Sequence, residues 1–471
     1  MADMKSFQKT LSKEQFEGQQ LNFMESVSYG FVGFGTNILA NMVASFVTYY
    51  YTNSVGIAAA TVGTMILLSK LLDGVSDFIM GIIIEKTHTK WGQAKPWLVV
   101  GTIPMAISMI MLFSCPASMS DGGKVGWMYF TYIFCNVICY TVVLMSMSSM
   151  LILMTGSTEA RTKASAFNQI LGSISLIFVS MFTEKIASAQ GWFMVSSVYA
   201  VVAVLSMVLA LFFCKERHHL IKDMAEKEEQ IKEELKEKGT LGRDLKDLVS
   251  VKYFWSLIII TMGKFLATGA ATGVAIYYFT DVVGNSAIFG IVTMIWFIPP
   301  MIVNLGITTL VRKVGSYHKI LAIGFFMQTI GWVLEAYAAP AHMGLMYFAA
   351  LLVGIGGSNM TLIFPLIGDV VSYGELKYGR ALTGLTNSGY SIGNKLGMGL
   401  GAASVGWILS FTGYDGTAAV QAASAIGGIR FIFGIIPGAV TLVAAIVAWV
   451  CHVEREVKEG REKAEAAAAA E

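Results

Sequence analysis

Two aspartates, Asp73 and Asp77, stand inside an apolar stretch and are the residues of this sequence with the clearest capacity for chemistry. They belong to the run KLLDGVSDFIMGIIIEKTHTKWGQAKPW, residues 70–97, which ends in a basic loop. In a helix, acids four positions apart lie on one face about one turn from each other, so a cation could be shared between them. A charged group at bilayer depth costs roughly 3 kcal/mol on insertion scales. If the run crosses a membrane, the two acids therefore predict an ion pathway, a proton relay or an ion site.

The composition predicts that the run does cross a membrane. Of the 471 residues, 55% are hydrophobic and only 14% are charged, whereas soluble domains carry about a quarter charged residues. The mean hydropathy is +0.64. We therefore expect a polytopic membrane protein that lies in a lipid bilayer and has no nucleic-acid partner.

The cysteines and histidines do not indicate a metal centre, a cofactor or an enzyme. The five cysteines fall in or beside apolar runs without metal spacing, and the six histidines lie in or next to loops without an HExxH motif. The first 23 residues are polar and lack the apolar core of a cleaved signal peptide. We expect reduced cysteines, no cofactor, and a chain that starts in the cytoplasm.

Twelve apolar runs are long enough to cross the roughly 30 Å of hydrocarbon in a bilayer. They lie near residues 25–52, 57–85, 96–115, 126–155, 163–188, 192–214, 253–281, 285–311, 319–338, 342–368, 382–412 and 424–452. Basic residues concentrate in alternate loops, and the opposite loops contain little beyond Lys124 and Lys185. By the positive-inside rule, we expect a multi-pass protein of the plasma (inner) membrane with both termini in the cytoplasm.

The longest charged interval, residues 215–252, divides the runs into two sets of six. We therefore expect a cytoplasmic N-terminal segment, an N-terminal six-helix bundle, a charged cytoplasmic connector, a C-terminal six-helix bundle and a cytoplasmic tail. Their predicted bounds are 1–24, 25–214, 215–252, 253–452 and 453–471.

An internal repeat supports this division. The first apolar run ends YYYTNSVG, residues 49–56, and the seventh ends YYFTDVVG, residues 277–284. A weaker pair at nearly the same offset is KWGQAKP, residues 90–96, and KVGSYHK, residues 313–319. Two repeated six-helix halves are the plan of a major-facilitator transporter, in which substrate binds near mid-membrane between the halves. The predicted fold class is thus all-α, a major-facilitator fold with 12 transmembrane helices in two six-helix bundles.

Polar side chains from both halves are predicted to share one depth in the membrane. Counted from the predicted cytoplasmic helix ends at about 1.5 Å per residue, four of them lie roughly 20 Å in. These four are Asn37, Asp73, Thr141 and Lys395, and Asp77, Lys264 and Lys70 lie close to the same layer. Such convergence is typical of a binding cavity.

The two aspartates have two interpretations. They could form a structural salt bridge with Lys70 or Lys395, but buried ion pairs often contribute little net stability. The alternative is a cation or proton site, because two adjacent carboxylates repel unless one is protonated or both share a cation. Na⁺ is a hard cation that prefers oxygen ligands, and Asp73, Asp77 and the Thr141 hydroxyl could supply them.

The remaining members of the layer also have alternatives. Lys395, with Lys70 nearby, is a candidate counter-charge when no cation is bound, or else part of a static ion pair. Lys264 could face an anionic or polar substrate, snorkel, or pair with the aspartates. Four further candidate substrate contacts could equally make interhelical hydrogen bonds; they are Asn37, Asn41, Asn387 and Asn394. Tyr390 is also a candidate substrate contact.

Several motifs resemble the glycoside-pentoside-hexuronide:cation symporters, the family of melibiose permease. SYGFVGFG with YYYTNSVG resembles the family's first helix, and LLDGVSDFIMG followed by KWGQAKPW resembles its second helix and the loop after it. GDVVSYGELKYGRALTG, leading to Lys395, resembles the loop before the eleventh helix and that helix. The resemblance covers most of the chain.

The resemblance implies a secondary transporter that couples Na⁺, Li⁺ or H⁺ to the uptake of a sugar or glycoside. Asp73 and Asp77 fall on the family's cation-binding aspartates, Thr141 on its helix-four cation-site threonine and Lys395 on its helix-eleven lysine. Arg161 falls on a basic loop position that the family uses in conformational cycling.

The sequence departs from melibiose permease where that protein binds sugar hydroxyls. Asn37 and Leu144 stand where the permease has acids, and Gln169 stands where it has an arginine. A galactoside is therefore not the expected substrate. The alternatives are another glycoside, a sugar acid that contacts Lys264, or a less polar compound such as a steroid.

We therefore expect a monomeric, cation-coupled importer of a sugar, glycoside or sugar acid. The alternative within transport is a cation-coupled carrier or exporter of an amphipathic non-sugar metabolite. An intramembrane enzyme is disfavoured because the acids lie on a single helix without a facing catalytic partner. A sensor would need an appended signalling domain, for which the sequence gives no sign.

Overall fold

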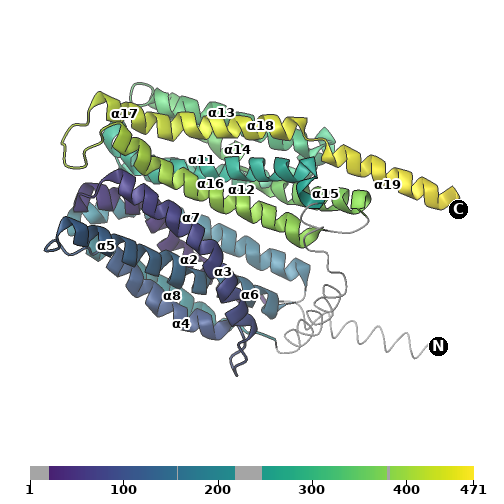
Figure 1. The fold of residues 1–471 in the computed structure, drawn as a ribbon, viewed down its shortest axis with the longest axis horizontal. Coiled ribbons are helices and arrows are strands. Elements are labelled where there is room, and N and C mark those ends of the chain that lie inside the picture. The colour runs from purple at the N-terminus through teal and green to yellow at the C-terminus, as the bar shows by residue number, and fades with distance from the viewer. Residues whose placement is uncertain (1–20, 156, 218–246, 379–381, 471) are drawn as a thin grey trace. The chain divides into compact units, whose positions relative to one another are not determined.

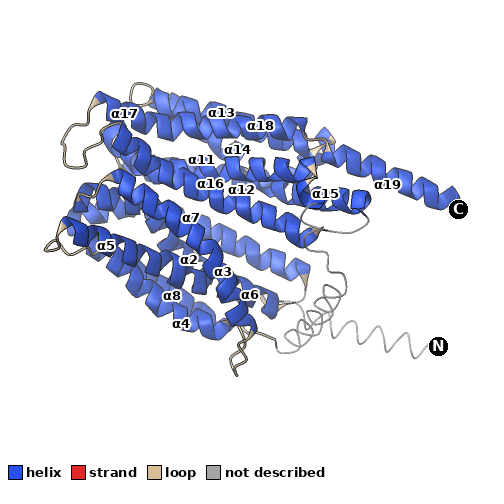
Figure 2. Cartoon of the chain, viewed as in Figure 1, coloured by secondary structure: helices blue, strands red, loops and turns tan. Residues whose placement is uncertain are grey.

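Helices joined by short loops make up most of the described part of the chain (Figures 1 and 2). The computed structural model describes residues 21–155, 157–217, 247–378 and 382–470. Within these residues no strand occurs, as predicted for an all-α membrane protein. Most of the predicted N-terminal segment and of the connector 215–252 lies outside the described residues.

The first predicted set of six spans is built from seven α-helices and two π-helical segments. In order they are α2 (Phe23–Tyr49), continued by the π-helical segment Tyr50–Val55; α3 (Ala59–Glu85); α4 (Lys95–Leu112); α5 (Asp121–Tyr132), continued by the π-helical segment Ile133–Tyr140 into α6 (Thr141–Met154); α7 (Thr158–Gln190); and α8 (Trp192–Phe213).

The second set repeats this plan and adds a terminal helix. Its elements are α11 (Lys252–Tyr277) with the π-helical segment Tyr278–Val282; α12 (Ala287–Val314); α13 (Tyr317–Ala338); α14 (Met343–Gly357) and α15 (Met360–Tyr378); α16 (Thr383–Phe411); and α17 (Ala423–Arg430), joined by the π-helical segment Phe431–Ile435 to α18 (Ile436–Val450). The tail forms α19 (Val453–Ala470).

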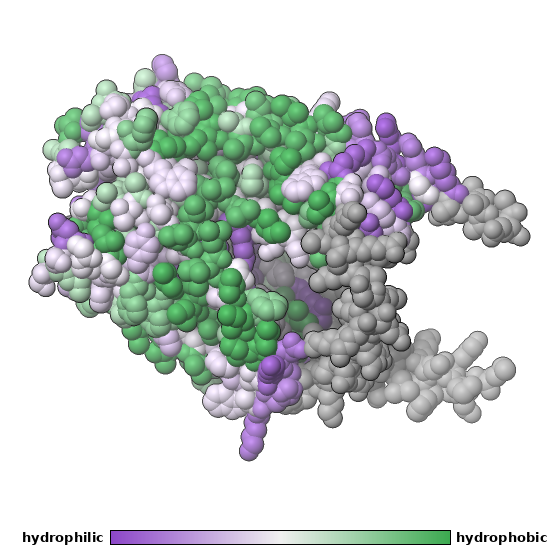
Figure 3. Space-filling view, viewed as in Figure 1, coloured by the Kyte–Doolittle hydropathy of each residue, from purple (hydrophilic) through white to green (hydrophobic). Residues whose placement is uncertain are grey.

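These elements confirm the twelve predicted spans. Among the described residues, ten helical segments are long and apolar enough to cross a membrane. Helices α3 and α16, with 27 and 29 residues, are also long enough and complete the twelve. These two helices carry Asp73, Asp77 and Lys395. Hydrophobic residues cover much of the molecular face drawn in Figure 3, as expected for helices that contact lipid.

The structure also confirms the internal repeat at the ends of α2 and α11. Each helix continues into a π-helical segment, and each repeat closes on a glycine with positive φ, 82° at Gly56 and 75° at Gly284. The hydroxyl of Tyr414 contacts equivalent residues of both copies: it accepts from Asn53 Nδ2 (2.9 Å) and donates to Asp281 Oδ2 (3.0 Å). The two motifs are thus equivalent in conformation as well as in sequence.

The chain is divided into two compact units. One lies within Met1–Val43 and Leu72–Lys238, and the other within Ala44–Leu71 and Gly239–Glu471. Helices α4 to α8 belong to the first unit and α11 to α19 to the second, and the division passes through α2 and α3. The predicted domain bounds 25–214 and 253–452 stay a prediction.

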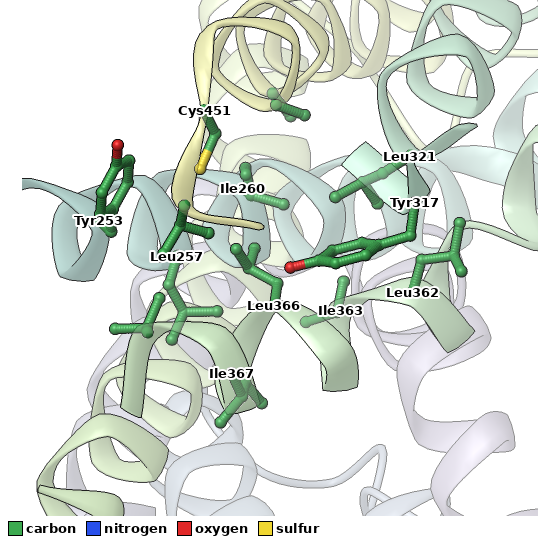
Figure 4. Packing of buried hydrophobic residues seen from close by; sticks show 14 of the residues in the cluster. Tyr253, Leu257, Ile260, Tyr317, Leu321, Leu362, Ile363, Leu366, Ile367 and Cys451 are labelled. Carbon is green, nitrogen blue, oxygen red and sulfur yellow. The ribbon is translucent and has the colours of Figure 1, made fainter. Parts of the chain in front are cut away.

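Close packing in the second unit depends on glycines and on an apolar core. Helices α3 and α16 approach so closely that a Cβ on Gly63 would lie 2.6 Å from the Ala403 carbonyl oxygen. In Figure 4, Leu257 of α11, Leu321 of α13 and Leu366 of α15 point toward a shared apolar core. This packing fixes the positions of the polar side chains that α11, α13 and α16 carry.

Candidate functional site

Helix α3 presents two different faces. Its exposed apolar residues recur every three or four positions, at Leu68, Leu71, Leu72, Val75, Phe78, Ile79, Ile82 and Ile83. Asp73, Ser76 and Asp77 lie on the rest of the surface and are partly buried. Because an i, i+3, i+4 pattern defines one side of a helix, the carboxylates point away from the apolar stripe and toward protein. This confirms that the two aspartates share a helix face.

Thr141 of α6 lies against both carboxylates within the first unit. Its hydroxyl oxygen is 3.2 Å from Asp73 Oδ1 and 3.3 Å from Asp77 Oδ1, and only 2% of the residue is exposed. The hydroxyl of Ser76 lies 3.2 Å from the same Thr141 oxygen and donates to the Asp73 carbonyl oxygen at 3.1 Å. Three residues proposed for cation binding from the sequence are therefore brought together.

A π-helical segment places Thr141 in this position. The segment Ile133–Tyr140 lies between α5 and α6, and Thr141 is the first residue after it. A π-helical segment inserted in an α-helix changes which side chains face a neighbour, and such segments are frequent at functional sites. The sequence does not reveal this change of register. Ser76 was also missed, although its position between the two acids places it on the same face.

This group of oxygens is suited to a monovalent cation or a proton. A hydroxyl has one proton, so Thr141 donates to one carboxylate at a time, and its oxygen keeps lone pairs for a cation. Among the described residues, no three His, Cys, Asp or Glu side chains cluster as a metal centre would need. Two carboxylates with neutral hydroxyls present hard oxygen donors, which suit a hard cation such as Na⁺.

The candidate counter-charges Lys70 and Lys395 belong to the second unit. The stem of Lys70 passes Gly399 of α16, where a Cβ would lie 3.0 Å from the lysine Cβ and 3.2 Å from its Cγ. Lys395 is four residues before Gly399 and therefore lies on the same face of α16. The stem of Lys70 thus lies against the stretch of α16 that carries Lys395, while the action of both lysines on the carboxylates stays a prediction.

Lys264 is part of a polar network within the second unit. Its ammonium lies 3.5 Å from Gln328 Oε1, which also accepts from Asn359 Nδ2 at 3.1 Å. Gln328 and Asn359 are 3% and 1% exposed. No acidic side chain pairs with Lys264 among the described residues. Gln328 is a neutral amide and carries no charge that would mark it in the sequence; the substrate contact of Lys264 stays a prediction.

The other predicted substrate contacts lie in different surroundings. Asn37 donates to the Gly33 carbonyl oxygen of its own helix at 2.8 Å and lies against Gly172 of α7. Asn41 donates to Ser175 Oγ at 3.0 Å, an interhelical hydrogen bond of the kind weighed as its alternative.

On α16, Asn387 is exposed, whereas the Tyr390 ring packs against Phe265 and Phe364 at centroid distances of 6.2 and 6.1 Å. Their roles as substrate contacts stay predictions.

Arg161, the predicted residue of conformational cycling, binds the C-terminal end of α6. Its Nε donates to the Thr155 carbonyl oxygen at 2.8 Å, and one terminal nitrogen lies 3.4 Å from the Ile152 carbonyl oxygen. A guanidinium at a helix C-terminus satisfies free carbonyls and interacts favourably with the helix dipole. Arg161 therefore joins the start of α7 to the end of the helix that carries Thr141.

The fold and its polar interior define a multi-pass membrane transporter of the major-facilitator type. The chain belongs to the family described as MFS/sugar transport protein, which matches residues 28–455.

Curated relatives cover almost the whole chain. An isoprimeverose transporter of Lactiplantibacillus pentosus is 28% identical over 427 residues, which are 88% of this chain and 85% of that protein. A glucuronide carrier protein homolog of Escherichia coli (strain K12) is 25% identical over 438 residues, 92% of this chain and 93% of that protein. Further relatives are named as symporters. These relatives confirm the predicted resemblance to the glycoside-pentoside-hexuronide symporters.

Solved structures agree on the fold. A crystal structure of the nucleoside transporter NupG matches 91% of this chain and 98% of its own length, with a TM-score of 0.61 and 14% identity. At this identity the likeness concerns the fold alone.

Proposed function

We propose that this protein is a cation-coupled symporter that carries a glycoside or a sugar acid across the membrane with Na⁺ or H⁺. Asp73 and Asp77 bind the coupling ion, Thr141 contributes its hydroxyl, and Lys395 and Lys70 supply the counter-charge. The observation that carries the proposal is the Thr141 hydroxyl, which lies within 3.3 Å of an oxygen of each carboxylate.

A carboxylate pair inside a membrane protein needs a compensating positive charge. An isolated ionised carboxylate is strongly disfavoured away from water, and two neighbouring carboxylates repel each other as well. A bound Na⁺ or a proton removes both penalties and leaves again when the site opens to the other side. This reversible neutralisation is the property that coupling to an ion gradient requires.

Lys264 and the relatives favour a sugar or a sugar acid as the cargo. The name of the isoprimeverose transporter denotes a neutral sugar, whereas that of the glucuronide carrier homolog denotes an anionic one. The Lys264 ammonium, which is held only by the Gln328 amide oxygen among the described residues, has donors left for a carboxylate. We therefore place a glucuronide-type sugar acid first and a neutral glycoside second.

The test of the ion site measures binding of radioactive ²²Na⁺ to the purified protein and to Asp73→Asn and Asp77→Asn. Both variants should lose the binding, because asparagine keeps the shape but removes the charge that holds the cation. Asp121→Asn is the matched control, since Asp121 is fully exposed at the start of α5, and it should bind as the native protein does.

If the native protein binds no Na⁺, the same variants are compared in proteoliposomes with an imposed pH gradient. Concentrative uptake that is undiminished in both asparagine variants would overturn the proposed ion site.

The cargo is identified by thermal shift of the native protein, with and without Na⁺. The probes are 4-nitrophenyl β-D-glucuronide, 4-nitrophenyl β-D-glucoside and a neutral steroid. A shift with a sugar that grows in Na⁺ or at low pH supports the proposed symport. A shift with the steroid alone would replace the sugar with an amphipathic cargo.

A further inference from the structure

A pocket in the first unit lies away from the candidate ion site, at the ends of two neighbouring helices. Its cavity volume is about 600 Å³, and it lies where α4 begins and α8 ends. Helices α4 and α8 pack side by side (Figure 1). Its lining includes the charged residues Lys90, Lys95, Lys215 and Glu216 and the apolar residues Val208 and Phe212. The pocket thus combines a basic mouth with an apolar wall.

The basic groups are available to an anionic ligand. Lys90 and Lys215 are exposed, and within the described chain neither makes an ion pair. Lys95 donates one hydrogen bond, to the Cys214 carbonyl oxygen at 2.8 Å, which leaves two of its three N–H groups. Three lysines therefore border one cavity together with a single carboxylate, that of Glu216, which leaves an excess of positive charge.

The one carboxylate in the pocket is already committed to the protein itself. Glu216 accepts from the backbone N–H groups of Gln93 at 2.7 Å and of Ala94 at 3.0 Å, and also from that of Lys95. These groups form the N-terminal end of α4, which favours an anion. Glu216 thus satisfies that helix end, and its carboxylate also interacts with the Lys95 ammonium.

The apolar wall continues along the outside of the helices. Phe212 is 72% exposed and Val208 is 40% exposed on α8, and Ile103 of α4 is 60% exposed. Trp91, 64% exposed, stands at the mouth. Tryptophan is enriched at membrane interfaces, where one side of the ring is apolar and the other meets polar headgroups. The basic loop predicts that this end of the helices faces the cytoplasm.

We propose that this pocket binds an anionic glycerophospholipid of the inner leaflet. The lysines Lys90, Lys95 and Lys215 hold the phosphate of the headgroup, and Trp91 lies at the level of the glycerol. The acyl chains follow the apolar surface that begins at Val208 and Phe212. Basic pockets between membrane helices on the cytoplasmic side bind such headgroups in general. The bound lipid would connect the ends of α4 and α8.

The test uses native mass spectrometry of the purified full-length protein, titrated with dioleoyl phosphatidylglycerol and with dioleoyl phosphatidylcholine. Phosphatidylglycerol should bind more tightly, because only it carries a net negative charge. In Lys90→Gln/Lys215→Gln its affinity should fall about 25-fold, since each lysine near the surface contributes about fivefold to anionic-lipid binding. Phosphatidylcholine binding should stay unchanged.

The matched control is Lys86→Gln/Lys313→Gln, which removes the same charge from exposed lysines outside the pocket. It should change phosphatidylglycerol affinity less than twofold. An equal loss in both double variants would overturn the proposal, because the lipid would then respond to net charge alone. Equal affinity of the native protein for both lipids would also overturn it.

A second measurement tests whether the bound lipid lies beside Trp91. Brominated phosphatidylglycerol should quench tryptophan fluorescence more strongly in the native protein than in Trp91→Phe. Competition with millimolar inorganic phosphate tests whether the pocket binds free phosphate instead of a lipid headgroup. If it displaces the lipid completely, the pocket is a site for free phosphate and the lipid proposal is wrong.

Discussion

Thr141→Val isolates the contribution of one hydroxyl to the proposed ion site. Valine has nearly the shape of threonine, so the substitution removes the oxygen that lies 3.2 Å from Asp73 and 3.3 Å from Asp77 and keeps the packing. Thr141→Ser is the complementary variant, because it keeps the oxygen and removes a buried methyl group. The two variants separate the role of the hydroxyl from that of the side-chain volume.

The expected loss follows from the charge of the partners. Hydrogen bonds to charged groups contribute about 1.5 to 3 kcal/mol, and a factor of ten in affinity is about 1.4 kcal/mol. If Thr141 is a Na⁺ ligand of comparable strength, Thr141→Val should weaken Na⁺ binding about 10- to 150-fold. Thr141→Ser should weaken it much less. Serine should instead lower the free energy of unfolding by about 1 kcal/mol, because the methyl group is buried.

The assay is a ²²Na⁺ titration of the purified native protein and of both variants, together with their thermal unfolding. Equal effects of valine and serine on Na⁺ affinity, or no effect of valine, would refute the role of the hydroxyl.

Two further predictions concern packing and topology. Gly63→Ala should destabilise the protein by about 1 to 3 kcal/mol, because its Cβ meets the Ala403 carbonyl, whereas Gly81→Ala in the same helix has open space and should be neutral or stabilising. Unfolding temperatures that change equally would contradict this. Cys115, beyond the end of α4, should react with an impermeant maleimide from outside intact cells. Because burial raises the pKa of its thiol, the rate should increase above neutral pH as the thiolate forms. Cys214, which follows the end of α8, is buried and should not react. Labelling absent from outside and present in inverted vesicles would reverse the predicted topology.

The sequence predicted the parts of the site that depend on one helix or on depth. The spacing of Asp73 and Asp77 placed them on one face, and counting residues from the helix ends placed Thr141 at a matching depth. The depth of a residue in the membrane does not determine which way its side chain points, however. Thr141 faces the carboxylates after the π-helical segment Ile133–Tyr140, and a single extra residue in a helical turn leaves no composition signal.

Contacts between segments that are distant in the sequence were harder to predict. The basic loop before α4 was recognised by its charges, but its partner Glu216 follows more than 120 positions later in the sequence. Likewise, Gln328 escaped notice because neutral amides are common in helices and only the folded structure places this one beside Lys264. The repeat was the exception. The similarity of its two copies predicted equivalent helix ends, and the structure has them at Gly56 and at Gly284.

The position of the carboxylates along α3 separates two parts of the predicted site. Residues up to Leu71 belong to the second compact unit, and the helix continues from Leu72 in the first. Asp73, Asp77 and Thr141 therefore belong to one compact unit, within which the Thr141 hydroxyl lies 3.2 and 3.3 Å from the two carboxylates. The candidate counter-charges Lys70 and Lys395 belong to the other unit. The contact between Thr141 and the two acids is thus internal to one unit, whichever role the lysines have.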